Sequence, residues 1–144
     1  MRTLIAALVV ALAASAAAPA RADTYVVVHA TNPVKALSQK EVTDLYMGRS
    51  RAFPNGDFAL VFDLPRDHAL RATFYQQLVG MSPAQVNSYW SRLMFTGQTM
   101  PPQPLPTEAA VLDMVRRNPS AIGYLADEPA DRGVRVVLTL RGAP

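Results

Sequence analysis

Four side chains that could surround a small anion lie close together in the chain: Asp63, Arg66, His68 and Arg71. Asp63 ends an apolar run, and the other three lie around the predicted start of a helix. Helix N-termini present unpaired N–H groups to anions, and basic side chains strengthen such a site. Asp67 would oppose an anion there and could pair with Arg71 across one helical turn. The stretch therefore predicts either a small-oxyanion site or a capped, solvated helix start.

Acid–base catalysis is a third use for the same residues, through Asp63, Asp67 and His68. Asp63 is the only acid predicted at a strand end, where α/β folds usually bind ligands. The sequence has no nucleophile elbow, no metal-binding histidine spacing and no P-loop. It has no cysteine, so it offers neither a thiolate nucleophile nor a zinc ribbon. We therefore expect no enzyme, no metal and no cofactor.

The first 22 residues have the pattern of a secretory signal peptide. Arg2 precedes an apolar, alanine-rich run over residues 3–18, and residues 20–22 form an A-x-A cleavage site. A membrane anchor usually needs about 20 strongly apolar residues, which this run does not supply. We expect cleavage before Asp23, a periplasmic location and a single domain over residues 23–144.

Charge and cysteine content narrow the class of the domain further. Without Arg2 and Arg21, 12 Lys and Arg face 11 Asp and Glu, so the net charge falls from +3 to +1. No basic block argues for nucleic acid, and no second apolar run is long enough to span a bilayer. Because an exported chain without cysteine has no disulfide support, the domain has to be held by its core.

Four apolar, β-rich segments are predicted to be strands, at residues 24–30, 58–62, 121–125 and 134–140. The first helix is predicted at residues 38–46. Its capping box is Ser38 with Glu41, and Gly48 ends it.

A second helix carries Leu70, Phe74 and Leu78 inward and ends at Gly80. Ser82 and Pro83 start a third helix, and Thr107 caps a fourth. The four prolines between residues 97 and 106 rule out regular structure there. Strands interleaved with helices predict a three-layer α/β domain with a partly parallel sheet.

Five short motifs follow one another between Thr31 and Leu125. They are NPV-x-x-LS-x-x-EV-x-D-L-Y-x-G at 32–48, F-P-N-G at 53–56, R-x-x-F at 71–74, Y-W-x-R-x-x-F-x-G-x-x-x-P-P at 89–102 and N-P-x-A-I-G-Y at 118–124. In this order they resemble the phosphate-type substrate-binding proteins of ABC transporters, in the periplasmic binding protein class. The resemblance implies a single lobe of a type II periplasmic-binding-protein-like (PBP-like) fold, with a mixed sheet flanked by about four helices.

The sequence departs from this family where the family binds phosphate. Family members have two lobes that close over the ligand, and the length of this chain leaves room for one. Their Ser-Gly-Thr run, at the start of the helix after the second strand, supplies hydroxyls and amides to phosphate. The corresponding residues here, 64–70, read LPRDHAL and lack that run.

Two functions therefore stay open. The resemblance implies a solute-binding-protein-like domain that binds phosphate or a related oxyanion for an ABC transporter. The alternative is a module without a small ligand that docks on an envelope protein. For that alternative, the predicted contact residues are Arg49, Arg51 and Phe53, together with the proline loop 97–106.

Overall fold

The computed structural model describes residues 22–97 and 99–142. The predicted signal peptide, apart from its last residue, lies outside the described residues. The two ends of the described domain meet, because the Gly142 N–H donates to Asp23 Oδ1 at 2.8 Å. No helix within the described ranges is long and apolar enough to cross a membrane.

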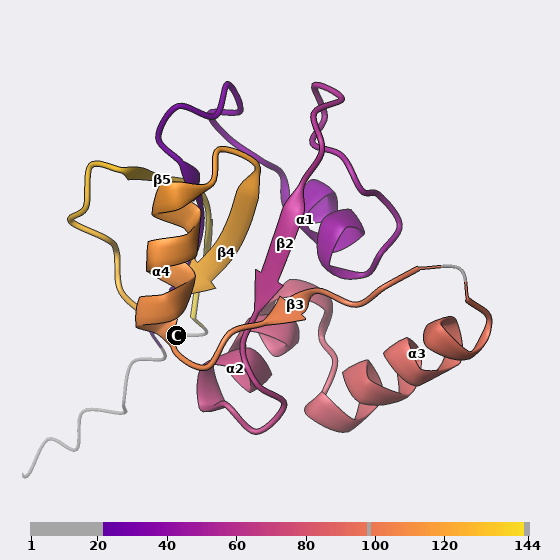
Figure 1. The fold of residues 1–144 in the computed structure, drawn as a ribbon. Helices are drawn as coiled ribbons and strands as arrows, with labels where there is room; N and C mark the ends of the chain where they lie inside the picture. Colours follow the sequence, from indigo (N-terminus) through magenta and orange to yellow (C-terminus); the bar gives the residue numbers. More distant parts are fainter. Residues whose placement is uncertain (1–21, 98, 143–144) are drawn as a thin grey trace, which may run out of the picture.

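A mixed sheet of five strands forms the middle of the domain (Figure 1). The strands are β1 (Thr24–His29), β2 (Leu60–Asp63), β3 (Gln103–Pro104), β4 (Ala121–Leu125) and β5 (Val134–Leu140). Their order is β3-β2-β4-β1-β5. β2 runs parallel to β3 and β4, and β1 runs antiparallel to β4 and β5. The predicted partly parallel sheet is confirmed.

Four helices flank the sheet: α1 (Gln39–Tyr46), α2 (Ala69–Val79), α3 (Pro83–Phe95) and α4 (Glu108–Arg117). Gly123 in β4 faces α4, since a Cβ atom there would lie 2.5 Å from Val111 Cγ1. The next residue, Tyr124, faces the opposite side and packs against Tyr46 of α1 and Phe74 of α2. Helices thus cover both faces of the sheet, and the predicted three-layer α/β class is confirmed.

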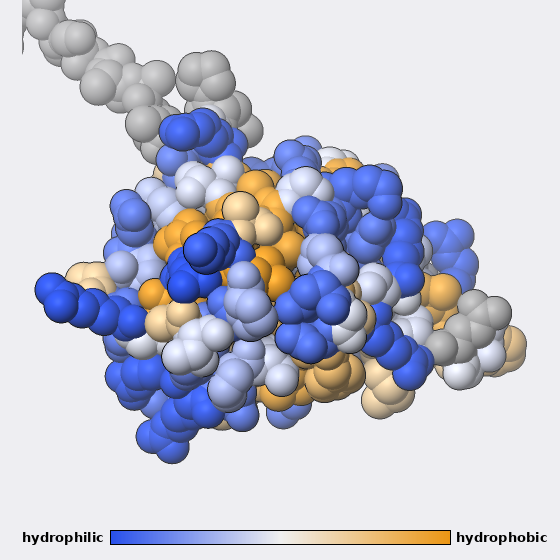
Figure 2. Space-filling model, turned by 90° about the horizontal axis from the view of Figure 1, so that it is seen from above, coloured by the Kyte–Doolittle hydropathy of each residue, from blue (hydrophilic) through white to orange (hydrophobic). Residues whose placement is uncertain are grey.

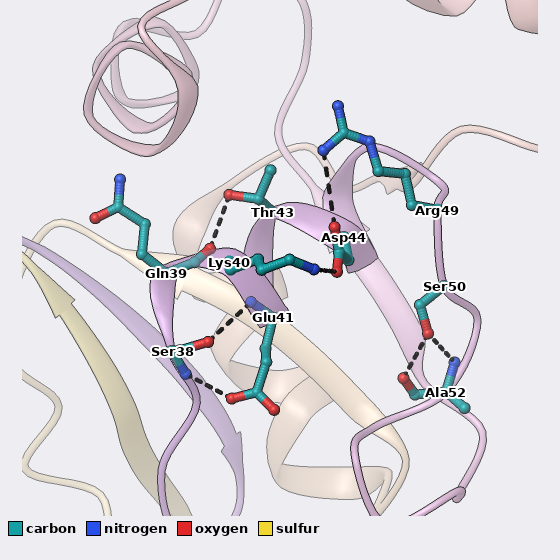
Figure 3. A network of polar contacts seen from close by, with 9 residues as sticks. All are labelled: Ser38, Gln39, Lys40, Glu41, Thr43, Asp44, Arg49, Ser50 and Ala52. Carbon is teal, nitrogen blue, oxygen red and sulfur yellow. Dashed lines mark hydrogen bonds and ion pairs between the residues drawn. The ribbon is translucent and has the colours of Figure 1, made fainter.

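The first helix forms as the sequence predicts. Ser38 Oγ accepts from the Glu41 N–H, and the Glu41 carboxylate accepts from the Ser38 N–H, which completes the capping box (Figure 3). Gly48 follows the helix with a left-handed φ of 73°. The other predicted caps, Ser82, Thr107 and the left-handed Gly80, are also present.

Two strand predictions are corrected. The strand predicted at 58–62 begins at Leu60, and Phe58 lies outside it with 61% of its surface exposed. The proline loop contains β3, where sequence predicted no regular structure. Pro104 fits in β3 because the strand lies at the edge of the sheet, where a missing N–H breaks no ladder.

The helix α3 extends to the side of the sheet in Figure 1, and two of its aromatic residues contact the end of α1. Trp90 is 4% exposed and approaches Gly48 so closely that a Cβ atom on Gly48 would lie 2.7 Å from Trp90 Cη2. Tyr89 donates its hydroxyl to the carbonyl oxygen of Met47 at 2.6 Å. The end of α1 and the middle of α3 are therefore fixed against each other.

Candidate functional site

Asp63 ends β2 and is buried, with 4% of its surface exposed. Its Oδ1 accepts from the Leu64 N–H at 2.8 Å and from the Tyr124 hydroxyl. Its Oδ2 accepts from the Tyr75 hydroxyl at 2.7 Å and lies 3.5 Å from Arg71 Nε. The carboxylate is therefore satisfied from within the chain, by residues of β4 and α2 and by the residue that follows its own strand.

Arg71 is the cation of this buried cluster. Its Nη1 donates to Asn87 Oδ1 of α3 at 3.3 Å, and its guanidinium lies 5.0 Å from the centre of the Tyr75 ring. The predicted pair with Asp67 is wrong, because α2 begins only at Ala69 and Asp67 is exposed in the turn before it. Arg71 instead points inward, where Asp63 needs a counter-charge.

The tyrosines around Asp63 have raised pKa values. Burial is the larger cause for Tyr75 and Tyr124, and the negative charge of Asp63 adds to it. Burial also raises the pKa of Tyr46, again with a contribution from Asp63. Tyr46 donates its hydroxyl to the carbonyl oxygen of Phe62 at 2.8 Å. All three phenols therefore act as neutral hydrogen-bond donors.

The other two anion candidates, Arg66 and His68, lie apart from this cluster. Arg66 is exposed in the turn before α2. His68 is the N-cap of α2, and its Nδ1 accepts from the Leu70 N–H at 3.1 Å. The four predicted residues thus divide into a buried ion pair and a surface helix start. The main surface hollows are lined by other residues.

The predicted partner-binding loop is also only partly exposed. Arg49 and Arg51 are exposed, and Arg49 lies 3.7 Å from the Asp44 carboxylate (Figure 3). The prediction that Phe53 contacts a partner is wrong, because this residue is 2% exposed and belongs to the core. Its N–H donates to the Asp57 carbonyl oxygen at 2.8 Å, which closes the loop.

Phe58 is exposed beside an apolar groove of about 600 Å³, which is lined by Arg51 and by part of the proline loop from the predicted partner surface. The groove lies between the end of α1, the start of β2 and the proline segment before β3. Met100 lines it as well and is 79% exposed. Met94 and Phe95, at the end of α3, are 52% and 94% exposed. Apolar residues also gather in the middle of the otherwise largely hydrophilic face that is seen from above the view of Figure 1 (Figure 2).

A signal for the groove is present in the sequence. Pro101, Pro102 and Pro104 cannot join a central ladder, and Phe58 follows directly on the turn at residues 54–57. What the sequence does not show is that the two segments lie next to each other. That adjacency comes from the parallel pairing of β2 with β3.

The fold is that of a shortened PBP-like domain of the kind found in phosphate ABC-transporter substrate-binding proteins. A solved structure of a putative phosphate ABC transporter substrate-binding protein with bound phosphate from Clostridium perfringens is similar at 20% identity and a TM-score of 0.65. An ABC-type phosphate transport receptor from Vibrio cholerae is similar at 16% identity and a TM-score of 0.64.

The similarity covers 82% of this chain but only 45% and 46% of those two proteins, so the chain spans about half of their length. At these identities the likeness concerns the fold. Comparisons with protein-family models and with curated protein sequences give no match.

Proposed function

We propose that this chain is an exported interaction module: a single PBP-like lobe that docks on a protein partner in the cell envelope and takes no small ligand. The observation that carries the proposal is the groove beside β3. It is lined mainly by apolar side chains, and Phe58 and Met100 stand at it largely exposed. Large exposed apolar patches that are rimmed by polar residues mark interaction sites.

The carboxyl ends of β2 and β4 support the same proposal. This is where α/β folds usually bind ligands. Here Asp63 puts a buried negative charge at the end of β2, and its acceptor positions are taken by Arg71, Tyr75 and Tyr124. At the end of β4, the Glu108 carboxylate accepts from the Ala126 N–H at 2.8 Å. Carboxylates thus stand where an oxyanion would need donors.

The second candidate function is the binding of phosphate or a related oxyanion for an ABC transporter. It is favoured by the fold shared with a protein whose solved structure holds phosphate, and by Arg66 near the amino end of α2. We rank it second because His68 already uses the Leu70 N–H and the other cation, Arg71, is paired with Asp63.

Position-specific photo-crosslinking in the native envelope tests the docking function. A photoreactive phenylalanine analogue replaces Phe58, Met100 or, as a control, Arg132 at the opposite edge of the sheet. We expect a discrete protein adduct from positions 58 and 100 and none from 132. No adduct from either groove position, or the same adduct from all three, would overturn the proposal.

Thermal unfolding with millimolar phosphate, sulfate and phosphonates tests the second candidate. A ligand that binds only the native state raises the melting temperature by mass action. We expect no shift. A rise with phosphate that is abolished by Arg66→Ala would instead establish oxyanion binding.

A further inference from the structure

Resting on the proposed docking function, we propose the chemical class of the partner. The groove beside β3 takes an acidic, amphipathic segment that inserts apolar side chains, and it does so without adding a strand to the sheet. Three features of the groove point to this occupant: its apolar lining, the sign of the charge around it and the backbone of its outer strand.

The lining supplies apolar surface and few polar groups. Leu45 contributes from the end of α1, Leu60 and Val61 from β2, and Met100 and Pro101 from the proline segment. Ser50 also lines the groove, but its hydroxyl already bonds to the backbone of Ala52 (Figure 3). An occupant therefore gains most by burying apolar side chains, as expected of a recognition groove for an amphipathic helix.

The charge around the groove is positive. Arg51 is the only charged residue among the described residues that line it, and exposed Arg49 lies two residues before it. Asp44 is shared between Lys40, at 2.8 Å, and Arg49, at 3.7 Å, so one carboxylate faces two cations (Figure 3). Asp57, beside Phe58, is the one further exposed acid in that loop.

The proline segment that lines the groove adds no acid, since residues 99–104 are all uncharged. Arg92 is the only charged residue between positions 83 and 106. A second copy that inserted its exposed Met94 and Phe95 into the groove would bring Arg92, on the same helical end, near Arg51. Like charges placed against each other at an interface oppose binding, whereas acidic side chains complement them. The charge thus selects an acidic partner over a second copy.

The outer edge of β3 excludes strand addition. The Leu105 N–H donates to the Asp63 carbonyl oxygen at 2.9 Å, so the backbone of that residue faces β2. Backbone direction alternates along a strand, which turns Pro104 outward, and proline has no N–H to offer. A peptide strand would find no amide donor there. Recognition has to come from side chains in the groove.

Two synthetic peptide probes test this class of partner. Both are fluorescein-labelled amphipathic 18-residue helices with one leucine stripe, and they differ only in having glutamate or lysine on the polar face. Binding to the purified protein is measured by fluorescence anisotropy. We expect the glutamate peptide to bind at least ten-fold more tightly than the lysine peptide, with the difference shrinking as salt is raised.

Variants assign the binding to the groove. Arg51→Glu is expected to weaken binding of the glutamate peptide at least ten-fold, while Arg132→Glu, at the far edge of the sheet, leaves it unchanged. Phe58→Ser with Met100→Ser is expected to weaken both peptides. Circular dichroism and the melting temperature identify any variant that fails to fold, and Arg51→Gln then replaces Arg51→Glu.

Three results would overturn the proposal. They are equal binding of the two peptides, no binding of either, and a glutamate preference that Arg51→Glu leaves intact. Self-association in sedimentation velocity that Phe95→Ser abolishes would also overturn it, in favour of a second copy. In each case the crosslinks from positions 58 and 100 report separately on whether the groove docks a protein at all.

Discussion

The ring of Tyr124 lies flat on the ring of Phe74, with centroids 3.8 Å apart and planes within 5° of parallel. Tyr124 comes from the centre of the sheet and Phe74 from α2, so the stack joins two layers of the domain. The same tyrosine donates its hydroxyl to Asp63. One residue thus connects the apolar core to the buried carboxylate, and several predictions concern that connection.

Removing either partner of the buried ion pair is expected to destabilise the domain strongly. Asp63→Ala or Arg71→Ala leaves the other charge buried without a partner, which costs about 3–5 kcal/mol. The double variant should cost clearly less than the sum of the two single changes, because the pair is lost only once. Urea unfolding measures all three. Asp67→Ala is the control, with an expected change within about 0.5 kcal/mol; a large effect there would restore the surface pair with Arg71.

The stability of the domain is expected to fall at alkaline pH. The folded-state pKa values of Tyr46, Tyr75 and Tyr124 are raised, whereas the unfolded chain ionises its tyrosines near pH ~10. The stabilisation is therefore complete below that pH and is lost as the pH rises toward the folded-state values. Each tyrosine contributes a slope of up to about 1.4 kcal/mol per pH unit.

Urea unfolding between pH 8.5 and 11 measures how the free energy of unfolding changes with pH. Tyr124→Phe removes one of the ionising groups, so its slope should be smaller by about one proton, in addition to a constant loss of about 1–3 kcal/mol for the Asp63 hydrogen bond. An unchanged slope in Tyr124→Phe would contradict the prediction.

Gly48 and Gly80 form a matched pair for measuring how tightly α3 is packed. Both have left-handed φ angles, 73° and 68°, so alanine at either position should cost about 1–2 kcal/mol in backbone strain. A Cβ atom on Gly48 would also lie 2.7 Å from Trp90 Cη2, whereas a Cβ atom on Gly80 would meet none of the described residues within 4 Å beyond its neighbours in the chain. We expect Gly48→Ala to cost about 1–3 kcal/mol more than Gly80→Ala in thermal or urea unfolding. Equal costs would mean that Trp90 moves aside freely.

Phe53 and Phe58 should behave in opposite ways although they belong to the same loop. Phe53→Ala empties part of the core and should cost about 3–5 kcal/mol, while Phe58→Ala should change stability by less than about 1 kcal/mol. Only Phe58→Ala should weaken docking in a folded protein. A large loss of stability in Phe58→Ala would show that its ring supports the fold instead of a partner.

The local structure of this domain could be predicted from the sequence because local signals carry it. Ser38 with Glu41, Ser82 with Pro83, and Gly80 each mark a helix end through contacts a few residues apart. The apolar face of Leu70, Phe74 and Leu78 is buried as predicted. The order of strands and helices then follows, apart from the two-residue β3.

The features that could not be predicted depend on contacts between residues of different elements. Arg71 follows Asp67 by four residues and Asp63 by eight. It pairs with Asp63 because the end of β2 lies next to α2 in the fold, which the sequence does not show. Phe53 and Phe58 flank one turn, and the sequence of that turn does not show which of the two rings is buried. The groove depends on β2 meeting the proline segment some 40 residues later. None of these contacts produces a periodic pattern in the sequence.

The order of the sheet also has a consequence for when the domain can fold. β1 pairs only with β4 and β5, and β2 pairs only with β3 and β4. Every ladder in the described sheet therefore waits for residues beyond position 102, although α1 to α3 can form locally long before. Such non-local topology slows folding, because loop closure precedes any gain from pairing. A growing chain would therefore form none of these ladders until the residues of β3 had been made.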